Sequence, residues 1–290
     1  GAFGFRMGSE IIRVLATGTN WIVVPKTVRL TLKGTLQPGV HARDIGFHFA
    51  ALLKQGALTA DLDYRVLEYA GDLDQFDLAS RAALCSTPTE IRAYGVFVPP
   101  SKAILEHAKT NAQRPFTPVY ADADAKYDAE LMLDVSRLEP QVSLPGSVEN
   151  AVDVSQVEGT VIDHAFIGSC GSGMWEDLVT TAAILKGRRL APNVRLFIAP
   201  GSELTNRRLA AEGLLSIFIE AGAVMLPPGC GPCNDAVIGP VHSGEVSIST
   251  ATNNNAGRFG AKDAQLYLGS PATVAASAVS GKIADARKLH

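Results

Sequence analysis

Three of the four cysteines in this chain of 290 residues lie in two short loops whose composition suits a metal site. Cys170 lies in the Gly- and Ser-rich segment 168–173, and Cys230 and Cys233 form a Cys-x-x-Cys pair in the Pro- and Gly-rich segment 228–233. Three thiolates can bind three irons of a cubane cluster and leave the fourth iron without a protein ligand. Such an iron is a Lewis acid that can bind a hydroxyl group and help it leave as water.

Three other interpretations of these cysteines stay open at this point. A zinc site could use the three thiolates together with His164, although this histidine would lie in the middle of a strand. Buried structural cysteines would need no metal, but the Gly- and Pro-rich loops are not the apolar faces on which such residues occur. A thiol nucleophile in segment 168–173 would need a base, and no histidine is an obvious one.

A polar stretch at 253–258 and the single carboxylate Glu90 are further candidates. On sequence alone, the stretch reads first as a solvated turn, and Glu90 as a surface or capping residue. In a site, the amides around Asn253 could bind substrate oxygens, and Arg258 could bind a carboxylate through two parallel hydrogen bonds.

The elements that must position these residues alternate between strands and helices. In the second half, three apolar runs predict strands and the two segments between them have helical spacing; in chain order these are 161–167, 175–186, 194–199, 206–221 and 224–226. This order predicts a mainly parallel sheet covered by helices. Cys170 and Cys230 each follow a predicted strand, so we expect both at the carboxyl edge of the sheet, where ligands bind in such folds.

The first half has the same kind of alternation. Strands are predicted at 21–24, 28–32, 64–69 and 96–98, and helices at 44–53, 76–94 and 101–110, with Pro88 interrupting the second helix. A polar region follows, and Pro- and Gly-containing segments near 139–146 then predict an extended crossover. We therefore predict an α/β protein of two three-layer units, with residues 1–155 as the first unit plus the crossover and residues 156–290 as the cysteine-bearing domain.

The composition excludes several classes of protein. Hydrophobic residues make up 47% of the chain and charged residues 19%, which is typical of a globular domain. The net charge of -3 gives no reason to expect nucleic acid or an anionic membrane as a partner, and no apolar run reaches the roughly 20 residues that span a bilayer. Four cysteines in so long a chain favour metal-binding or catalytic thiols in a reducing compartment, so we expect a cytoplasmic protein.

Taken together, these residues resemble the aconitase superfamily, and most of all the large subunits of isopropylmalate isomerase. The resemblance covers almost the whole chain, and the two cysteine loops carry it because two separate motifs occur in the expected order. The strongest stretches are 134–140, 168–170, 175–178, 228–233 and 270–272, with weaker similarity at 1–4 and 14–17.

The resemblance implies a [4Fe-4S] hydro-lyase that removes water from a small hydroxy acid and, in the isomerases, adds it back at the neighbouring carbon. Cys170, Cys230 and Cys233 correspond to the cluster ligands. Glu90 corresponds to an active-site glutamate that bonds the hydroxyl or water on the open iron. Arg258 corresponds to an arginine that binds a substrate carboxylate.

The sequence also departs from the family pattern. Ser86 stands where the family usually has an asparagine, and Asn253 replaces one substrate-binding arginine. Residues 171–172 read Gly-Ser in place of Thr-Asn. Since a lost cation weakens the binding of a highly anionic substrate, we expect a hydroxy acid that is less charged than citrate or differently shaped.

The resemblance further implies partners. In the isomerases, the swivelling domain that supplies the catalytic base is a separate small subunit, and the family's first domain begins well before residue 1. We therefore expect the chain to need a small swivel-domain subunit and an N-terminal segment for activity. A non-catalytic iron or redox sensor is the alternative function, and a structural protein without a cluster is a third.

Overall fold

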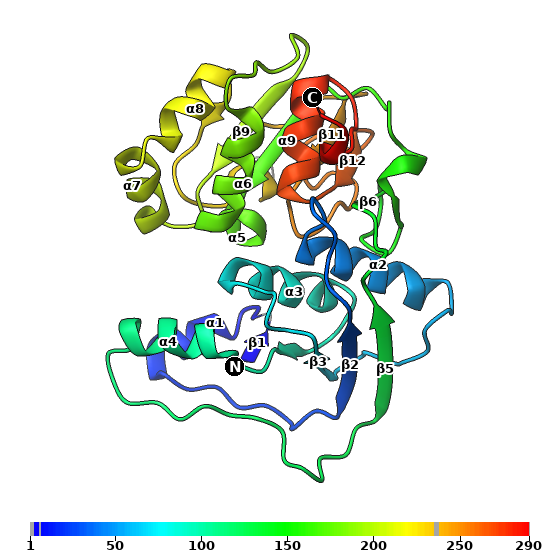
Figure 1. The fold of residues 1–290 in the computed structure, drawn as a ribbon, viewed down its shortest axis with the longest axis vertical. Coiled ribbons are helices and arrows are strands. Elements are labelled where there is room, and N and C mark those ends of the chain that lie inside the picture. The colour runs from blue at the N-terminus through cyan, green and yellow to red at the C-terminus, as the bar shows by residue number, and fades with distance from the viewer. Residues whose placement is uncertain (1–2, 6, 235–237, 290) are drawn as a thin grey trace.

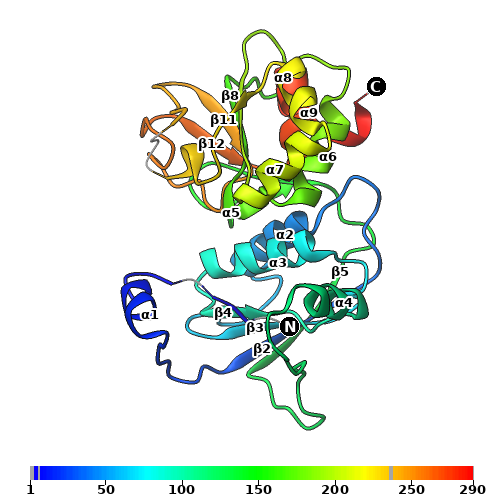
Figure 2. The ribbon, with the colours of Figure 1, turned by 90° about the vertical axis from the view of Figure 1, so that its left-hand side faces the viewer.

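Two β-sheets, each with its own helices, are stacked along the long axis of the molecule (Figures 1 and 2). The computed structural model describes residues 3–5, 7–234 and 238–289. Residues 1, 2 and 290, at the ends of the two predicted domains, lie outside these ranges. Residues 1 and 2 belong to the stretch 1–4 that is weakly similar to the family.

The first unit is built on a five-stranded sheet in the order β1-β4-β3-β2-β5 (Figure 1). Its strands are β1 (Phe3–Phe5), β2 (Thr27–Lys33), β3 (Val66–Gly71), β4 (Gly95–Phe97) and β5 (Ala129–Asp134). The neighbouring strands are parallel except for β1, which is antiparallel to β4. Along β2, Val28, Leu30 and Leu32 are fully buried and the residues between them are half-buried, so one face of the sheet forms the core.

Helices α2 and α3 cover that buried face and lie between the two sheets (Figures 1 and 2). The helices of this unit are α1 (Ile11–Thr17), α2 (Ala42–Lys54), α3 (Leu78–Glu90) and α4 (Lys102–Asn111). Pro88 lies in the last turn of α3, so it marks the end of the predicted helix and does not kink its middle.

The N-terminus of α2 differs from the prediction. The helix begins at Ala42, and Asp44 lies in its first turn, where its carboxylate accepts a hydrogen bond from the backbone N–H of His41 (2.7 Å). The same carboxylate accepts a bond from the backbone N–H of Gln141 (3.0 Å). The Asp44 side chain is fully buried, and Gln141 belongs to the second sheet. Asp44 therefore connects the two units.

The second unit is built on a seven-stranded sheet in the order β10-β9-β8-β11-β12-β6-β7. Its strands are β6 (Gln141–Ser143), β7 (Ala151–Asp153), β8 (His164–Gly168), β9 (Arg195–Ala199), β10 (Val224–Met225), β11 (Val246–Ser249) and β12 (Gln265–Leu268). The run from β10 to β12 is parallel, and β6 and β7 extend it in antiparallel fashion. The predicted α/β class with mainly parallel sheets is therefore confirmed.

Helices cover one face of this sheet, and loops cover the other (Figure 2). The helices are α5 (Ser169–Ser172), α6 (Trp175–Leu185), α7 (Glu203–Ala211), α8 (Leu214–Ala221) and α9 (Pro271–Ser280), with 3-10 turns η1 (Val154–Gln156), η2 (Gly231–Cys233) and η3 (Ala286–Lys288). In β8, Ala165 and Ile167 pack with the core beneath the helices. Phe166 faces the other way and meets Phe259 of the loop side edge-on, with ring centroids 6.4 Å apart.

Two predicted elements are wrong in detail. Residues 21–24 are exposed and form no strand. A run of β-branched residues does not form a strand unless a neighbouring strand pairs with it. The single helix predicted at 206–221 is two helices, α7 and α8, separated by Gly213 in a left-handed conformation (φ 77°) that glycine adopts readily. The domain boundary near residue 155 stays a prediction. The chain enters the second sheet earlier, at Gln141.

None of the helices in the described ranges is long and apolar enough to cross a lipid bilayer.

Candidate active site

A tight turn at the end of β8 places Cys170. Gly168 has φ 136°, and a Cβ atom at this position would lie 1.9 Å from the carbonyl oxygen of Ala199, so only glycine fits. The N–H of Gly168 donates to the Oγ1 atom of Thr250 (2.9 Å). Ser169 follows with φ 60°, and Cys170 then lies exposed in the short helix α5.

The Cys-x-x-Cys pair lies at the same edge of the sheet. Strand β10 is separated from β8 only by β9, and all three strands are parallel, so the chain segments after β8 and β10 leave the same side. Cys230 is exposed, and Cys233 is buried in the 3-10 turn η2. Burial raises the pKa of the Cys170 thiol, and the nearby Cys233 and Cys230 thiols raise it further. The structure therefore brings the three predicted sulfur ligands into one region.

The zinc interpretation does not hold. His164 is fully buried at the start of β8, and its ring nitrogens contact the Oγ atom of Ser247 (2.8 Å) and the carbonyl oxygen of Gly239 (3.1 Å). Burial lowers the pKa of His164 to about 4, which keeps the ring neutral in this position. In the part of the chain that the structure describes, no three His, Cys, Asp or Glu side chains are placed to hold a single metal ion.

The two units meet beside the cysteines. Helix α3 of the first unit packs against α5, which carries Cys170 (Figure 1). Glu90 is the last residue of α3, and Ser86 lies one turn before it; both are half-buried. The side-chain amide of Asn253 crosses from the second unit and donates to the Glu90 carboxylate (3.4 Å). Arg258 also reaches the site, since its Nη2 atom lies 3.9 Å from the Sγ atom of Cys233. We call the three cysteines and the loops 168–173, 228–233 and 250–258 the cysteine site.

Buried polar atoms without a hydrogen-bond partner are concentrated at the cysteine site. Among the described residues, six such side-chain atoms occur, and five belong to residues of these loops or to Arg43, which contacts them. The five are Arg43 Nε, Ser169 Oγ, Asn253 Oδ1, Asn254 Oδ1 and Arg258 Nε. Because a buried polar group without a partner is costly, these atoms fit a site completed by a polar, charged group. Three thiols beside two guanidinium groups are a suitable donor set for an anionic iron–sulfur cluster.

Arg43 is the functional candidate that sequence reasoning missed. It is the second residue of α2, and its side chain is 1% exposed. Its guanidinium donates to the carbonyl oxygens of Gly171 (3.3 Å) and Ala251, both in the cysteine site. The available signal was the charged pair Arg43–Asp44 at the start of a mostly apolar helix, since charged residues are rarely buried without a specific role.

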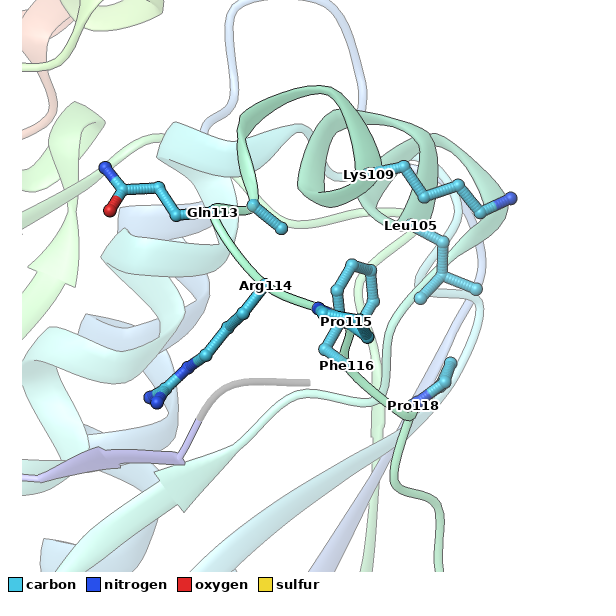
Figure 3. A pocket seen from close by; sticks show the side chains of 8 residues that line it. Leu105, Lys109, Gln113, Arg114, Pro115, Phe116 and Pro118 are labelled. Atoms are coloured by element: carbon cyan, nitrogen blue, oxygen red, sulfur yellow. The ribbon is translucent and has the colours of Figure 1, made fainter.

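Several cavities lined by described residues lie outside the cysteine site. One of about 500 Å³ lies at α4 and the loop after it, and Lys109, Arg114 and Phe116 are among the residues that line it (Figure 3). Another of about 600 Å³ lies where the segment before α2 meets α6 and α9, with His41 and Arg287 in its wall. No predicted site residue lines either cavity.

Comparisons with known proteins agree with the sequence resemblance. The sequence model of the aconitase family (aconitate hydratase) matches residues 1–161 and 155–281. The large subunit 1 of 3-isopropylmalate dehydratase from Methanopyrus kandleri is 41% identical over 99% of this chain and 68% of its own length. The homoaconitase large subunit of Thermus thermophilus is 38% identical over 100% of this chain and 68% of its own.

Other relatives extend the same pattern. A probable methanogen homoaconitase large subunit from Methanosarcina mazei is 39% identical over 100% of this chain and 73% of its own length. Among solved structures, aconitase X of Thermococcus kodakaraensis matches 82% of this chain and 52% of its own with a TM-score of 0.44 and 15% identity. Since the family match spans nearly the whole sequence and the relatives share about two residues in five with it, the chain belongs to the aconitase family.

Proposed function

We propose that this chain is the large subunit of a hydro-lyase that holds a [4Fe-4S] cluster on Cys170, Cys230 and Cys233 and dehydrates or isomerises a small hydroxy acid. One observation supports the proposal: three thiols lie near one another at the carboxyl edge of the second sheet, and the loop that reaches Cys233 through Arg258 also contacts Glu90 of the first unit through Asn253. The names of the relatives, which are dehydratase and homoaconitase large subunits, support the same reaction class.

The chemistry of the cysteine site suits the proposed cluster. Thiolates are the protein ligands of iron–sulfur clusters, and three thiols lie near one another here. A bound cluster would supply a Lewis-acidic iron that weakens the C–O bond of a substrate hydroxyl. Arg258 and Arg43 lie beside the thiols and would offset the negative charge of thiolate ligands.

Glu90 and Asn253 are suited to handling the hydroxyl group. Glu90 is half-buried and receives a hydrogen bond from the Nδ2 atom of Asn253, which holds the carboxylate in one orientation. We assign Glu90 the role of binding the hydroxyl or water, and Ser86 a place on the same helix beside the substrate. The buried Oδ1 atom of Asn253 has no partner in the described structure and would accept a donor from the substrate.

Arg258 is the proposed anchor for a substrate carboxylate. Its Nε atom is buried without an acceptor, so a carboxylate oxygen there would satisfy it. Asn253 offers a neutral amide where an arginine would offer a second cation. We therefore propose a hydroxy acid with less negative charge than citrate.

The proposed activity also requires a partner subunit. The relatives are named large subunits, so we propose a small swivel-domain subunit that supplies the catalytic base. The chain covers 68–73% of the length of these relatives. All four cysteines are free, which suits a reducing, cytoplasmic compartment.

Turnover in variants of Glu90 tests the proposed reaction. The protein is assembled with its small subunit under anaerobic conditions, and hydration of an unsaturated acid is followed for wild type, Glu90→Gln and Glu68→Gln. Glu68 is a matched control because its carboxylate contacts Tyr127 (3.0 Å) in the first unit. We expect kcat to fall on the order of 100-fold for Glu90→Gln, in line with the loss of a positioned proton-handling group, and to be unchanged for Glu68→Gln.

Equal activity of the two variants would contradict the role of Glu90. A protein that binds the cluster but turns over no hydroxy acid with its small subunit would favour the alternative, a non-catalytic iron or redox sensor.

A further inference from the structure

We propose that Arg43 is a positioning residue of the cysteine site: its guanidinium holds two site loops together and places a fixed positive charge beside the cysteine sulfurs. The charge effect rests on the proposed cluster function, whereas the loop-holding effect concerns the chain alone.

The hydrogen bonds of Arg43 join segments that are distant in sequence. Its Nη1 atom donates to the carbonyl oxygen of Gly171 (3.3 Å), the residue after Cys170. Its Nη2 atom donates to the carbonyl oxygen of Ala251, two residues before Asn253. One planar group from the first unit therefore fixes the loop of a proposed ligand and the loop of a proposed substrate residue at once.

The two loops are also packed closely around this group. A Cβ atom at Gly171 would lie 2.7 Å from the carbonyl oxygen of Thr250 and 3.4 Å from the Nη1 atom of Arg43. The guanidinium stands over the ring of Phe47, one turn along α2, at 5.0 Å from the ring centroid. Arg43 is 1% exposed and therefore has little room to move.

The charge of Arg43 has no direct counter-ion. Within the described ranges, the hydrogen-bond acceptors that its guanidinium contacts are two neutral carbonyl oxygens and no carboxylate. The neighbouring carboxylate of Asp44 is occupied by two backbone N–H groups, and burial raises its pKa to about 7. A fully buried cation is costly unless anions lie close by. The carboxylates of Asp177 and Asp44 act on Arg43 through space, and the sulfurs of Cys233 and Cys170, which are also near it, become anionic when they bind metal.

Two measurable consequences follow. Without Arg43, loops 168–173 and 250–258 should open more often, even in the protein without a cluster. With a cluster bound, loss of a nearby positive charge should lower its reduction potential, because the reduced state carries more negative charge.

The experiment compares three variants with wild type. Arg43→Met removes the charge and both donors at similar length, and Arg43→Lys keeps the charge but not the fork of donors. Arg81→Met is the matched control, because Arg81 is also a buried arginine that bonds three carbonyls, those of Leu73, Phe76 and Pro99, but within the first unit. Amide hydrogen exchange is measured on the full chain without a cluster, and the midpoint potential is measured after anaerobic reconstitution.

We expect Arg43→Met to exchange on the order of tenfold faster than wild type in segments 168–173 and 250–253, and to shift the midpoint potential to a more negative value. Arg43→Lys should show the faster exchange but keep a potential near that of wild type. Arg81→Met should change neither the exchange of these segments nor the potential.

Several results would overturn the inference. Local exchange in Arg43→Met equal to that of wild type or of Arg81→Met would contradict the loop-holding role. An unchanged potential in Arg43→Met would contradict the charge effect. If wild type took up no cluster, the proposed function would fail and the charge effect with it, while the exchange result would still decide the loop-holding role.

Discussion

At the scale of single residues, the cysteine site combines predicted and unpredicted side chains. Cys170, Cys230 and Cys233 could be identified from sequence because cysteine is rare and loop motifs are local. The contact between Glu90 and Asn253 could not, since these residues are 163 positions apart and meet only when the two units pack. Arg43 was missed because its partners are backbone carbonyls of two distant loops, and no side-chain type in the sequence marks such partners.

The first residue-level prediction concerns substrate choice. Asn253→Arg places a cation where the chain has a neutral amide, so we expect turnover to shift toward more anionic hydroxy acids, by on the order of tenfold in the ratio of kcat/KM values. A panel of hydroxy acids with two and three carboxylates measures this ratio. An unchanged ratio would contradict the role of Asn253 in substrate selection.

The second residue-level prediction concerns the stability of the fold at acidic pH. Burial lowers the pKa of His164 to about 4 from an unfolded value of 6.5, so the unfolded chain binds this proton first as the pH falls. The stabilisation is present above pH 6.5 and is lost between pH 6.5 and 4, by up to about 3 kcal/mol at about 1.4 kcal/mol per pH unit.

Urea unfolding at pH 6.5 and 4.5 of wild type, His164→Gln and His107→Gln measures this loss. His107 is exposed on α4 and serves as the control. We expect His164→Gln to be less stable at pH 6.5 but to lose less stability on acidification. Burial raises the pKa of Asp44 to about 7, so its protonation stabilises the fold as the pH falls. This contribution is the same in all three proteins and cancels when their pH profiles are compared. Parallel pH profiles for the three would be inconsistent with a neutral buried His164.

At the scale of elements, the sequence predicted the strands and helices that have a clear apolar period of their own. Strands β2, β8 and β9 and helices α2, α4 and α6 lie within a few residues of their predicted positions, because each has a clear apolar period. Strands β1, β5, β6, β7, β11 and β12 were not predicted. All but the six-residue β5 are only three or four residues long, and hydrogen bonds from neighbouring strands, not their own composition, define them.

The N-terminus of α2 gives an element-level prediction. Asp44→Ala leaves the buried N–H groups of His41 and Gln141 without an acceptor, so we expect a loss of about 2–4 kcal/mol in the free energy of unfolding. Asp77→Ala removes one N-cap bond, to Ser80 (2.8 Å) on α3, and should cost only about 1 kcal/mol. Chemical denaturation of both variants measures the difference. Equal losses would mean that Asp44 does not join the units energetically.

At the scale of the whole molecule, the class of fold was predictable but the arrangement of its parts was not. Alternating strands and helices gave mainly parallel sheets, as found. The packing of α2 and α3 between the sheets depends on long-range contacts that no window of sequence contains (Figure 1). That packing adds side chains of the first unit to the cysteine site, because α3 and α2 bring Glu90 and Arg43 to loops of the other unit.

The most direct test of the account measures iron and acid-labile sulfide per chain after anaerobic reconstitution. Wild type and Cys85→Ser, which alters a cysteine of α3 outside the site, should each bind about four irons and four sulfides. Cys170→Ser, Cys230→Ser and Cys233→Ser should each bind far less and lose the visible absorption of the cluster. A wild-type chain without iron and sulfide, or three serine variants that bind as much as wild type, would contradict the account.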